Sequence, residues 1–482
     1  MAVDYDLVII GGGSAGLVAA SAGAQLKGRV ALVEKEKRGL GGDCLFYGCV
    51  PSKSMIHSAK IAYDATNASR FGVHANVSHI DFEKAMGHVH DVVGTIAIHD
   101  STERFESLGV EVIYGSGEFK DEHTFTVNGR DLKARAFIVA TGSHPALPPV
   151  DGLKEAGYLN NVDIFSNLKD RPASLAVIGA GPIGCELGQS FSRLGSEVTI
   201  ISSRDHIMPK EDPEAAKVVE QKLREEGIRI LNNSRAQKVE VKDGKKHVYV
   251  GDEVIVVDEI LVSAGRVPNV SSLNLEAAGV EVGKAGIKVN EKLQTSNKRI
   301  YAAGDVIGGY QFTHVAGYEG AVAMQNGMLS IGPLAKKSPD YSVIPWATFT
   351  EPELGRVGMT EQQARDRYGD DIYILKHNFD HLDRALAEAA GYGFAKIITK
   401  SDGTILGAHI VGPHAGELIH EVVLAMSQGL KVGVLTSMIH VYPTLSEVNS
   451  KAALQLTKQK YAANTSLQNL LRKFFNWRRS IA

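Results

Sequence analysis

The segment YDLVIIGGGSAG, residues 5–16, joins a largely apolar run to a glycine-rich turn. Gly11, Gly13 and Gly16 have the GxGxxG spacing, and a helical stretch leads to a second apolar run that ends at Glu34. Glycines in such a turn let a pyrophosphate approach the N-terminus of a helix, and an acid at the next strand end holds a ribose hydroxyl. The segment therefore predicts a dinucleotide-binding α/β domain.

The same pattern recurs later in the chain. Residues 175–178 form an apolar run, Gly179, Gly181 and Gly184 repeat the spacing, and a helix and a strand over residues 198–201 follow. Two such segments predict two dinucleotides, one bound permanently and one exchanging. That combination is typical of a flavoprotein that receives electrons from a nicotinamide.

The ends of the two second strands differ. Glu34 lies 23 positions after Gly11, whereas the same offset from Gly179 gives Ser202. No carboxylate is available there for a ribose diol, and Arg204 is placed to pair with a 2′-phosphate. We therefore expect FAD at the first segment and NADPH at the second, with NADH as the alternative.

Length and composition limit the remaining choices. A chain of 482 residues is too long for one hydrophobic core, so we expect two to four domains. A net charge of -3 gives no electrostatic reason to expect nucleic-acid binding. The sequence has no apolar stretch of about 20 residues and no early segment typical of a signal peptide. We expect a cytoplasmic protein.

Two of the three cysteines lie in the segment GGDCLFYGCVPSK, residues 41–53. Cys44 and Cys49 precede a predicted helix, whose positive end favours a thiolate. Four intervening residues allow the pair to close into a disulfide. Beside a flavin, such a pair accepts two electrons and passes them on by thiol–disulfide exchange. Cys185, in the second glycine-turn helix, is interpreted as a packing residue.

This segment resembles the GGTCxNxGCxPSK motif of the pyridine nucleotide-disulfide oxidoreductases, which include dihydrolipoyl dehydrogenase, glutathione reductase and mercuric reductase. Asp43 replaces the usual threonine and Phe46 the usual asparagine. The resemblance extends to about residue 460. It implies an α/β fold with two doubly wound dinucleotide-binding domains, for FAD and NAD(P), and a C-terminal α+β dimerisation domain that forms a homodimer.

The resemblance also implies roles for single residues. Cys49 would face the flavin as a thiolate, Cys44 would attack the substrate, and Lys53 with Glu186 would form an ion pair near the flavin ring. Further cofactor-binding positions lie in the cysteine segment, in ATGS (residues 140–143), in AGRVPN (residues 264–269) and in YAAGD (residues 301–305): Gly42, Thr141, Gly142, Arg266 and Asp305. Asp305 would bond the ribityl chain.

The expected division of the chain has five ranges. They are 1–150 and 271–340 for the FAD-binding domain, 151–270 for the NAD(P)-binding domain, 341–463 for the dimerisation domain and 464–482 for a basic amphipathic tail. His409, in an apolar strand of the dimerisation domain, is interpreted as a packing residue.

The resemblance breaks near the C-terminus. Disulfide reductases of the family carry a His-Pro-x-x-x-Glu element, in which the glutamate orients an acid/base histidine. The matching stretch runs from Tyr442 to Glu447, and a phenol with a pKa near 10 is a poor proton acceptor. His440 would substitute only if it lay on the side of Tyr442, and we interpret it as a structural or interface histidine.

Mercuric reductases place a tyrosine at this position, and a soft metal ion needs thiolates but no general base. Those enzymes also carry a further C-terminal cysteine pair, which this chain lacks. We therefore expect a mercuric-reductase-like reductase of a metal ion or another small electron acceptor, with no resident metal. The alternatives are a dihydrolipoyl dehydrogenase or other disulfide reductase, and a redox-sensing flavoprotein that acts as an interaction module.

Residues 466–479 of the tail have apolar residues at helical spacing together with four basic residues. We expect this helix to dock its apolar side on the enzyme or on a partner. The alternative is peripheral contact with an anionic membrane surface.

Overall fold

The computed structural model describes residues 3–330 and 335–481 and divides into two compact units. The first unit consists of the chain up to Ser203 and of Ser234–Asp340, and the second of Arg204–Asn233 and the chain from Tyr341 onward. Residues 204–233, expected within the NAD(P)-binding domain, are thus grouped with the second unit. The five-range division stays a prediction.

The first unit is built around β1 (Tyr5–Ile10), whose side chains are buried at five of six positions. In the register of the parallel strands, Ile9 lies between Leu32 and Ile138. The sheet order is β3-β2-β1-β6-β5-β4, and β18 also pairs with β6. The other strands are β2 (Val30–Glu34), β3 (Val110–Tyr114), β4 (Gly117–Asp121), β5 (Thr124–Val127), β6 (Arg130–Val139) and β18 (Ile300–Ala302).

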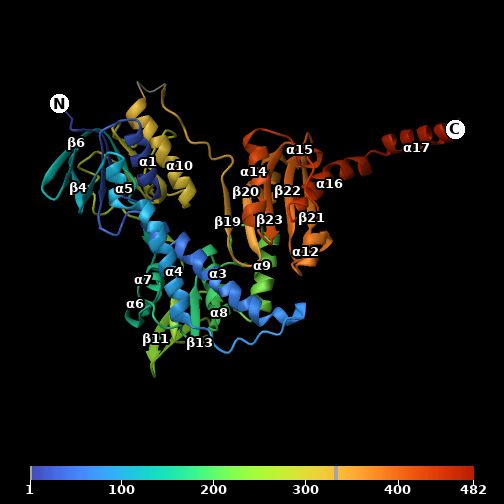
Figure 1. Cartoon of the computed structure of the whole chain (residues 1–482), viewed down its shortest axis with the longest axis horizontal. Coiled ribbons are helices and arrows are strands. Elements are labelled where there is room, and N and C mark those ends of the chain that lie inside the picture. The colour runs from blue at the N-terminus through green and yellow to red at the C-terminus, as the bar shows by residue number, and fades with distance from the viewer. Residues whose placement is uncertain (1–2, 331–334, 482) are drawn as a thin grey trace. The chain divides into compact units, whose positions relative to one another are not determined.

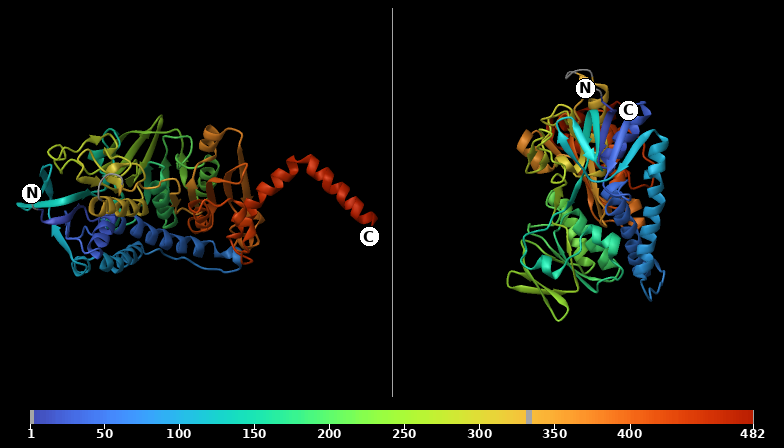
Figure 2. Two further views of the ribbon diagram at one scale, coloured as in Figure 1. Left: turned by 90° about the horizontal axis from the view of Figure 1, so that it is seen from above. Right: turned by 90° about the vertical axis from the view of Figure 1, so that its left-hand side faces the viewer.

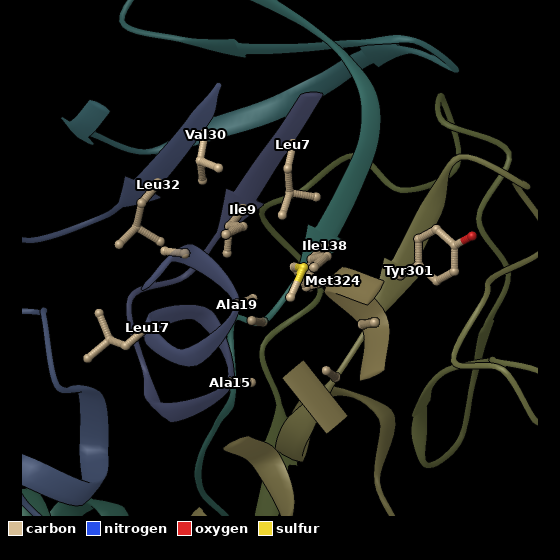
Figure 3. Packing of buried hydrophobic residues seen from close by; sticks show 14 of the residues in the cluster. Leu7, Ile9, Ala15, Leu17, Ala19, Val30, Leu32, Ile138, Tyr301 and Met324 are labelled. Carbon is tan, nitrogen blue, oxygen red and sulfur yellow. The ribbon is translucent and has the colours of Figure 1, made fainter. Parts of the chain in front are cut away.

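Helices α1 (Ser14–Gln25) and α10 (Thr313–Met324) cover one face of this sheet and lie side by side (Figure 1). Leu7 and Ile9 of β1 point toward α1, and Met324 of α10 packs in the same cluster (Figure 3). Burial of each such side chain stabilises the fold by about 1.5–3 kcal/mol. This core fixes where α1 begins, directly after the first glycine turn.

The opposite face of the sheet packs on chain segments instead of long helices. Phe119, Phe125 and Phe137 make edge-to-face ring contacts at centroid distances of 5.1 and 5.5 Å. Buried residues of the segment 273–287 complete this cluster. Short antiparallel pairs occur in the same unit: β7 (Ser143–Pro145) with β15 (Arg266–Pro268), and β16 (Val282–Gly283) with β17 (Gly286–Ile287).

A second parallel sheet contains β8 (Ser174–Ile178), β9 (Glu197–Ile201) and β14 (Glu259–Val262), with β8 in the middle. Helix α8 (Pro182–Arg193) follows β8, and Pro182 stands at its first position, where a missing N–H costs nothing. The same part of the chain also forms two short helices and a three-stranded antiparallel sheet. These are α6 (Leu153–Ala156), α7 (Asn161–Asn167), β11 (Ala236–Lys242), β12 (Lys245–Val250) and β13 (Glu253–Val257).

Four helices separate β2 from β3. They are α2 (Gly42–Phe46), α3 (Cys49–Thr66), α4 (Phe82–Ala97) and α5 (Thr102–Ser107). Helix α3 packs against both α4 and α8. The packing of α3 on α8 therefore brings the cysteine segment toward the second parallel sheet.

The second unit holds a five-stranded antiparallel sheet in the order β19-β20-β23-β22-β21. Its central strands, β22 (Phe394–Lys400) and β23 (Ile405–Gly412), are buried on both faces, and most of their residues are apolar. The other strands of this sheet are β19 (Pro345–Thr348), β20 (Glu353–Gly358) and β21 (Ile372–Asn378), and the short strand β10 (Arg229–Leu231) lies outside it. The helices are α9 (Pro213–Glu225), α11 (Glu361–Tyr368), α12 (Asp383–Ala387), α13 (Ala415–Leu418), α14 (His420–Ser427), α15 (Gly433–Ser437), α16 (Glu447–Ala463) and α17 (Thr465–Ser480).

Polar groups are buried in this second unit. The Lys396 ammonium lies 3.0 Å from an Asp212 oxygen and 2.7 Å from a Glu214 oxygen, and its side chain is 4% exposed. His409 is fully buried, and its Nε2 lies 3.2 Å from the Met359 carbonyl oxygen. Burial lowers the pKa of His409 to about 4, so the ring is neutral at pH 7. The interpretation of His409 as a packing residue is confirmed.

The fold class expected from the sequence is confirmed, whereas docking of the tail on its own chain is not observed. Helix α17 has no buried residue. None of the helices formed by residues 3–330 and 335–481 is long and apolar enough to cross a membrane.

Candidate active site

At two positions of the first glycine turn, Gly11 and Gly16, the surrounding backbone leaves no space for a side chain. Gly11 has a φ of 109°, and a Cβ there would lie 2.4 Å from the Ala140 oxygen. A Cβ on Gly16 would lie 1.9 Å from the Gly11 oxygen. Gly13 precedes α1, and a Cβ on Gly42 would approach the Gly13 Cα to 2.8 Å. The N-terminus of α1 therefore presents a side-chain-free backbone surface, which suits a phosphate group.

The carboxylate of Glu34 lies at this turn. Its Oε2 accepts a 2.6 Å hydrogen bond from the Gly12 N–H, and its Oε1 accepts one of 3.2 Å from the Glu36 N–H. The end of β2 thus holds an acceptor beside the glycine turn. This is the position expected for a group that holds a ribose hydroxyl.

The second glycine turn repeats this geometry. A Cβ on Gly179 would lie 2.5 Å from the Ser263 oxygen, and one on Gly184 would lie 2.1 Å from the Gly179 oxygen. A Cβ on Gly181, directly before α8, would meet nothing within 4 Å. Only two of the three glycines are sterically required, yet the helix N-terminus is presented as in the first turn.

The strand end after this second turn carries no carboxylate. Ser202 follows β9 and is 2% exposed, and Arg204 is exposed. The first turn has the Glu34 carboxylate at the corresponding place. The second has the Ser202 hydroxyl, with Arg204 two positions later in the sequence.

The two thiols lie on separate helices. Cys44 is in α2, and Cys49 is the first residue of α3, where the helix dipole favours a thiolate. The Cys49 Sγ lies 3.2 Å from Oγ1 of Thr313, the first residue of α10. All three cysteines of the chain are present as free thiols. Cys185 is fully buried, which confirms its interpretation as a packing residue.

The two thiols differ in acidity. A hydrogen bond from the Cys44 thiol lowers the pKa of Cys49 to about 6, and Thr313 and the positive charge of Lys53 act in the same direction against burial. The same thiol contact, followed by burial, raises the pKa of Cys44. At neutral pH the pair therefore carries its negative charge on Cys49.

An ion pair lies one helical turn beyond Cys49. The Lys53 Nζ donates a 2.9 Å hydrogen bond to Oε2 of Glu186 in α8, whose side chain is 6% exposed. Lys53 and Glu186 are 133 positions apart, and the packing of α3 on α8 brings them together. The structure thus joins the two residues that the sequence comparison paired.

A second charged group connects the cysteine segment to the segments expected at FAD. The Arg266 Nη2 lies 3.1 Å from Oδ2 of Asp43, and its Nε lies 3.5 Å from Oδ2 of Asp305. The Ser143 hydroxyl donates to the same Asp305 oxygen at 2.6 Å. Burial raises the pKa of Asp43, and the Arg266 charge opposes this effect. Asp43, where the family motif has threonine, is therefore tied to Arg266.

Thr141 and Gly142 belong to the same region. The Thr141 hydroxyl donates to the Asn269 carbonyl at 2.8 Å, and the Asn269 amide returns a 2.8 Å hydrogen bond to the Thr141 carbonyl. The Asn269 N–H donates to the Gly142 carbonyl at 3.0 Å. These bonds join residues 141–142 to Asn269, at the two ends of the segment that is predicted to bind NAD(P).

The side chains of Tyr442 and Glu447, near the C-terminus, are hydrogen-bonded to other groups and not to each other. The Tyr442 hydroxyl donates a 2.7 Å hydrogen bond to Asp383, which raises the Tyr442 pKa. The Thr444 N–H donates to Glu447 at 3.3 Å. The phenol and the glutamate therefore do not form the pair that the family element would form.

His440 is engaged elsewhere. Its Nε2 lies 3.4 Å from Oε2 of Glu421, an oxygen that also accepts a 2.9 Å hydrogen bond from the Asn449 amide. The His440 side chain is only 6% exposed. This geometry agrees with a structural histidine, although its role stays a prediction.

Sequence reasoning missed Thr313 and the partners of Asp43 and Tyr442. Thr313 is 264 positions from Cys49, and no motif in the sequence links them. The one available signal was the departure of Asp43 from the family threonine, because a carboxylate at a half-buried site needs a cationic partner.

Comparisons with known proteins were made for the whole chain. A model described as pyridine nucleotide-disulphide oxidoreductase matches residues 5–320, and the model of that family's dimerisation domain matches residues 344–453. The mercuric reductase of Staphylococcus aureus is 37% identical over 461 residues, which cover 94% of this chain and 83% of that protein. The dihydrolipoyl dehydrogenase of Chlamydia pneumoniae is 35% identical over 465 residues, which cover 95% and 98%.

A similar solved structure is the HOCl-induced flavoprotein disulfide reductase RclA from Escherichia coli. It has a TM-score of 0.83 and 30% sequence identity, and the match covers 92% of this chain and 98% of that chain. Its Cu(II) complex is similar, with a TM-score of 0.82 and 29% identity.

The family models cover both the nucleotide-binding segments and the five-stranded sheet. Members of the family bind FAD and NAD(P)H, and the dimerisation domain supports a homodimer. The chain belongs to the pyridine nucleotide-disulphide oxidoreductases and is an NAD(P)H-dependent flavin disulfide oxidoreductase.

Proposed function

We propose that this enzyme uses NADPH to reduce the Cys44–Cys49 pair, which then reduces a thiol-bound soft metal ion or another small electron acceptor. The observation that supports this most directly is an acidic Cys49 thiol beside Cys44, combined with a C-terminal element whose Tyr442 and His440 are held by other partners. Metal reduction needs thiolates and no such base.

The residues around the first glycine turn fit FAD. Gly11, Gly13, Gly16 and Gly42 leave a backbone surface without side chains, and Glu34 lies beside it. A Cβ at Gly11, Gly16 or Gly42 would clash with the neighbouring backbone, so the turn depends on glycine there. We assign Thr141, Gly142, Arg266 and Asp305 to the flavin end of this site. FAD, when bound, passes two electrons from the nicotinamide to the protein disulfide.

NADPH is proposed over NADH for the second turn. Gly179, Gly181 and Gly184 present the N-terminus of α8, and Ser202 leaves no carboxylate to repel a 2′-phosphate. Arg204 is the proposed partner of that phosphate.

The protein groups have separate tasks in the proposed reaction. Two electrons break the Cys44–Cys49 disulfide and leave two sulfurs, with the charge first on Cys49. Lys53, held by Glu186, stabilises that charge. Cys44 then displaces a carrier thiolate from the metal ion, and that carrier leaves as a thiol with the Cys44 proton, so that both sulfurs hold the metal ion as thiolates. The two thiolates give two electrons to Hg(II), which becomes Hg(0), and the disulfide forms again.

Disulfide reduction is the second candidate, because relatives named dihydrolipoyl dehydrogenase are 35–36% identical over most of the chain. It would require a base other than Tyr442. A redox-sensing module without turnover is disfavoured, because the family consists of enzymes.

Steady-state NADPH oxidation tests the proposal, with a Hg(II)–thiol complex, a Cu(II)–thiol complex and lipoamide as parallel acceptors. We expect rapid turnover with a metal complex, and loss of at least tenfold in kcat in both Cys44→Ser and Cys49→Ser. Cys185→Ser is the matched control and keeps native turnover. Rapid turnover with lipoamide alone would favour the second candidate.

A further inference from the structure

The last helix of the chain has an amphipathic surface that nothing in its own unit covers. Five large apolar side chains of α17, and Ile481 just beyond it, are between 39% and 64% exposed, whereas Leu471 is partly buried: Leu467, Leu470, Phe474, Phe475, Trp477 and Ile481. Figure 2 shows α17 as a separate rod that continues beyond α16. An apolar surface of this kind costs free energy in water, so it calls for a partner.

The start of α17 is fixed, so it is not a frayed extension of α16. The Asn464 side chain accepts a 2.9 Å hydrogen bond from the Leu467 N–H and caps the new helix. The Gln468 amide donates to the carbonyls of Tyr461 and Ala462 in the last turn of α16, at 2.8 and 3.1 Å. These contacts define α17 as a helix of its own, and its 16 residues span about 24 Å.

The charge of this segment has one sign. Residues 464–482 contain four basic residues and no aspartate or glutamate: Arg472, Lys473, Arg478 and Arg479. At about 3.6 residues per turn, Arg472 and Lys473 lie on opposite borders of the apolar side. Arg478 falls within the apolar side at the last turn, where a long stem can lie in an apolar layer while its guanidinium reaches the surface.

Aromatic residues gather toward the same end. The ring of Phe474 lies 5.4 Å from that of Phe475 and 6.0 Å from that of Trp477, measured between centroids. Tryptophan beside basic residues is typical of helices that lie at the boundary between headgroups and acyl chains.

We propose that α17 lies in the surface of a membrane that contains anionic phospholipid and attaches this reductase to it. The bordering cations contact headgroup phosphates and carboxylates, and the apolar side enters the acyl boundary. A second copy of α17 is a poor partner, because the two segments carry charge of the same sign. This inference goes beyond the proposed reaction and does not depend on its acceptor.

Vesicle sedimentation of the full-length holoenzyme tests this attachment. Vesicles of phosphatidylcholine with about 30% phosphatidylserine are compared with pure phosphatidylcholine at moderate salt. Each basic residue near an anionic surface contributes about a fivefold factor in binding. We therefore expect Arg472→Gln with Lys473→Gln to weaken binding to the anionic vesicles about 25-fold. The matched control, Lys458→Gln with Lys460→Gln in α16, removes the same charge and is expected to change binding less than about threefold.

Trp477 gives a second readout. Its fluorescence is expected to shift to the blue on anionic vesicles, and Phe474→Ser is expected to weaken binding while NADPH turnover stays native. Equal binding of the full chain and of a chain ending at Ala463 would overturn the proposal. Equal binding to neutral and anionic vesicles would also overturn it. A larger assembly of the full chain than of the shortened chain in solution would instead assign α17 to a protein contact.

Discussion

Cys44 and Cys49 differ in acidity because their surroundings differ. Burial raises the pKa of both thiols, but Cys49 begins α3, receives a hydrogen bond from Cys44 and lies one turn from Lys53, whereas Cys44 donates to its neighbour. The thiolate is therefore placed on the residue proposed to face the flavin. The neutral thiol is the one proposed to meet the acceptor.

This assignment predicts a specific titration of the reduced protein. Ultraviolet thiolate absorbance should rise with a midpoint near pH 6, because the lowered pKa leaves Cys49 ionised above that pH and protonated below it. Lys53→Gln should raise the midpoint by about 1 pH unit, since it removes the nearby positive charge. Lys60→Gln, farther along α3 and paired with Asp64, is the control. A midpoint near 9 in the native protein would contradict the assignment.

At this scale, the sequence predicted residues that a motif or a family pattern marks. The cysteine segment and the Lys53–Glu186 pair are examples, and the distance of 2.9 Å agrees with the expected pair. Thr313 and Asp383 were not predicted, because their contacts with Cys49 and Tyr442 depend on packing between elements far apart in the chain. No local pattern records such a contact.

At the scale of elements, the backbone surface at the N-terminus of α1, where we propose that FAD binds, depends on the glycine turn before this helix. Gly16→Ala would place a Cβ 1.9 Å from the Gly11 oxygen, so the turn must open. We expect a loss of stability of about 1–3 kcal/mol and poor retention of FAD after dialysis. Thermal unfolding and the flavin-to-protein absorbance ratio measure both effects.

Gly94→Ala provides the matched control for this substitution. A Cβ at Gly94, in α4, would meet nothing within 4 Å, and alanine is the better helix former by about 0.5–1 kcal/mol. We expect equal or greater stability with full flavin content. Similar losses in both variants would show that the close contact at Gly16 is not decisive.

Strand β22 supplies a second prediction at this scale. Lys396→Met would leave the buried Asp212 carboxylate without its ammonium partner, and breaking such a pair costs about 3–5 kcal/mol. The urea midpoint should fall accordingly. Lys120→Met, which breaks the exposed pair with Asp131, should leave the midpoint nearly unchanged. A small effect at Lys396 would mean that water reaches this cluster.

The sequence predicted which helices and strands form more reliably than where each one begins or what packs against it. The apolar runs and glycine turns correctly predicted β1, β8 and the helices that follow them. Cys44, expected just before a helix, lies in the short helix α2 instead. The tail was expected to dock on the enzyme or on a partner, and α17 has no buried residue within this chain, because helical periodicity specifies an apolar side and not the surface that covers it.

At the scale of the whole molecule, the dimerisation domain predicts the state of the protein in solution. Sedimentation equilibrium should give about twice the chain mass of 51.7 kDa at micromolar concentration, because the chain contains the dimerisation domain of the family. The shortened chain that ends at Ala463 should give the corresponding dimer mass. A monomer in both cases would contradict the homodimer.

Helix α17 also makes the distribution of charge along the chain uneven. It contributes +4 to a total of -3, so the preceding 463 residues carry -7. An anionic surface that attracts the tail therefore repels the rest of the protein. We expect this repulsion to act on the catalytic body, so that α17 alone holds the enzyme at such a surface.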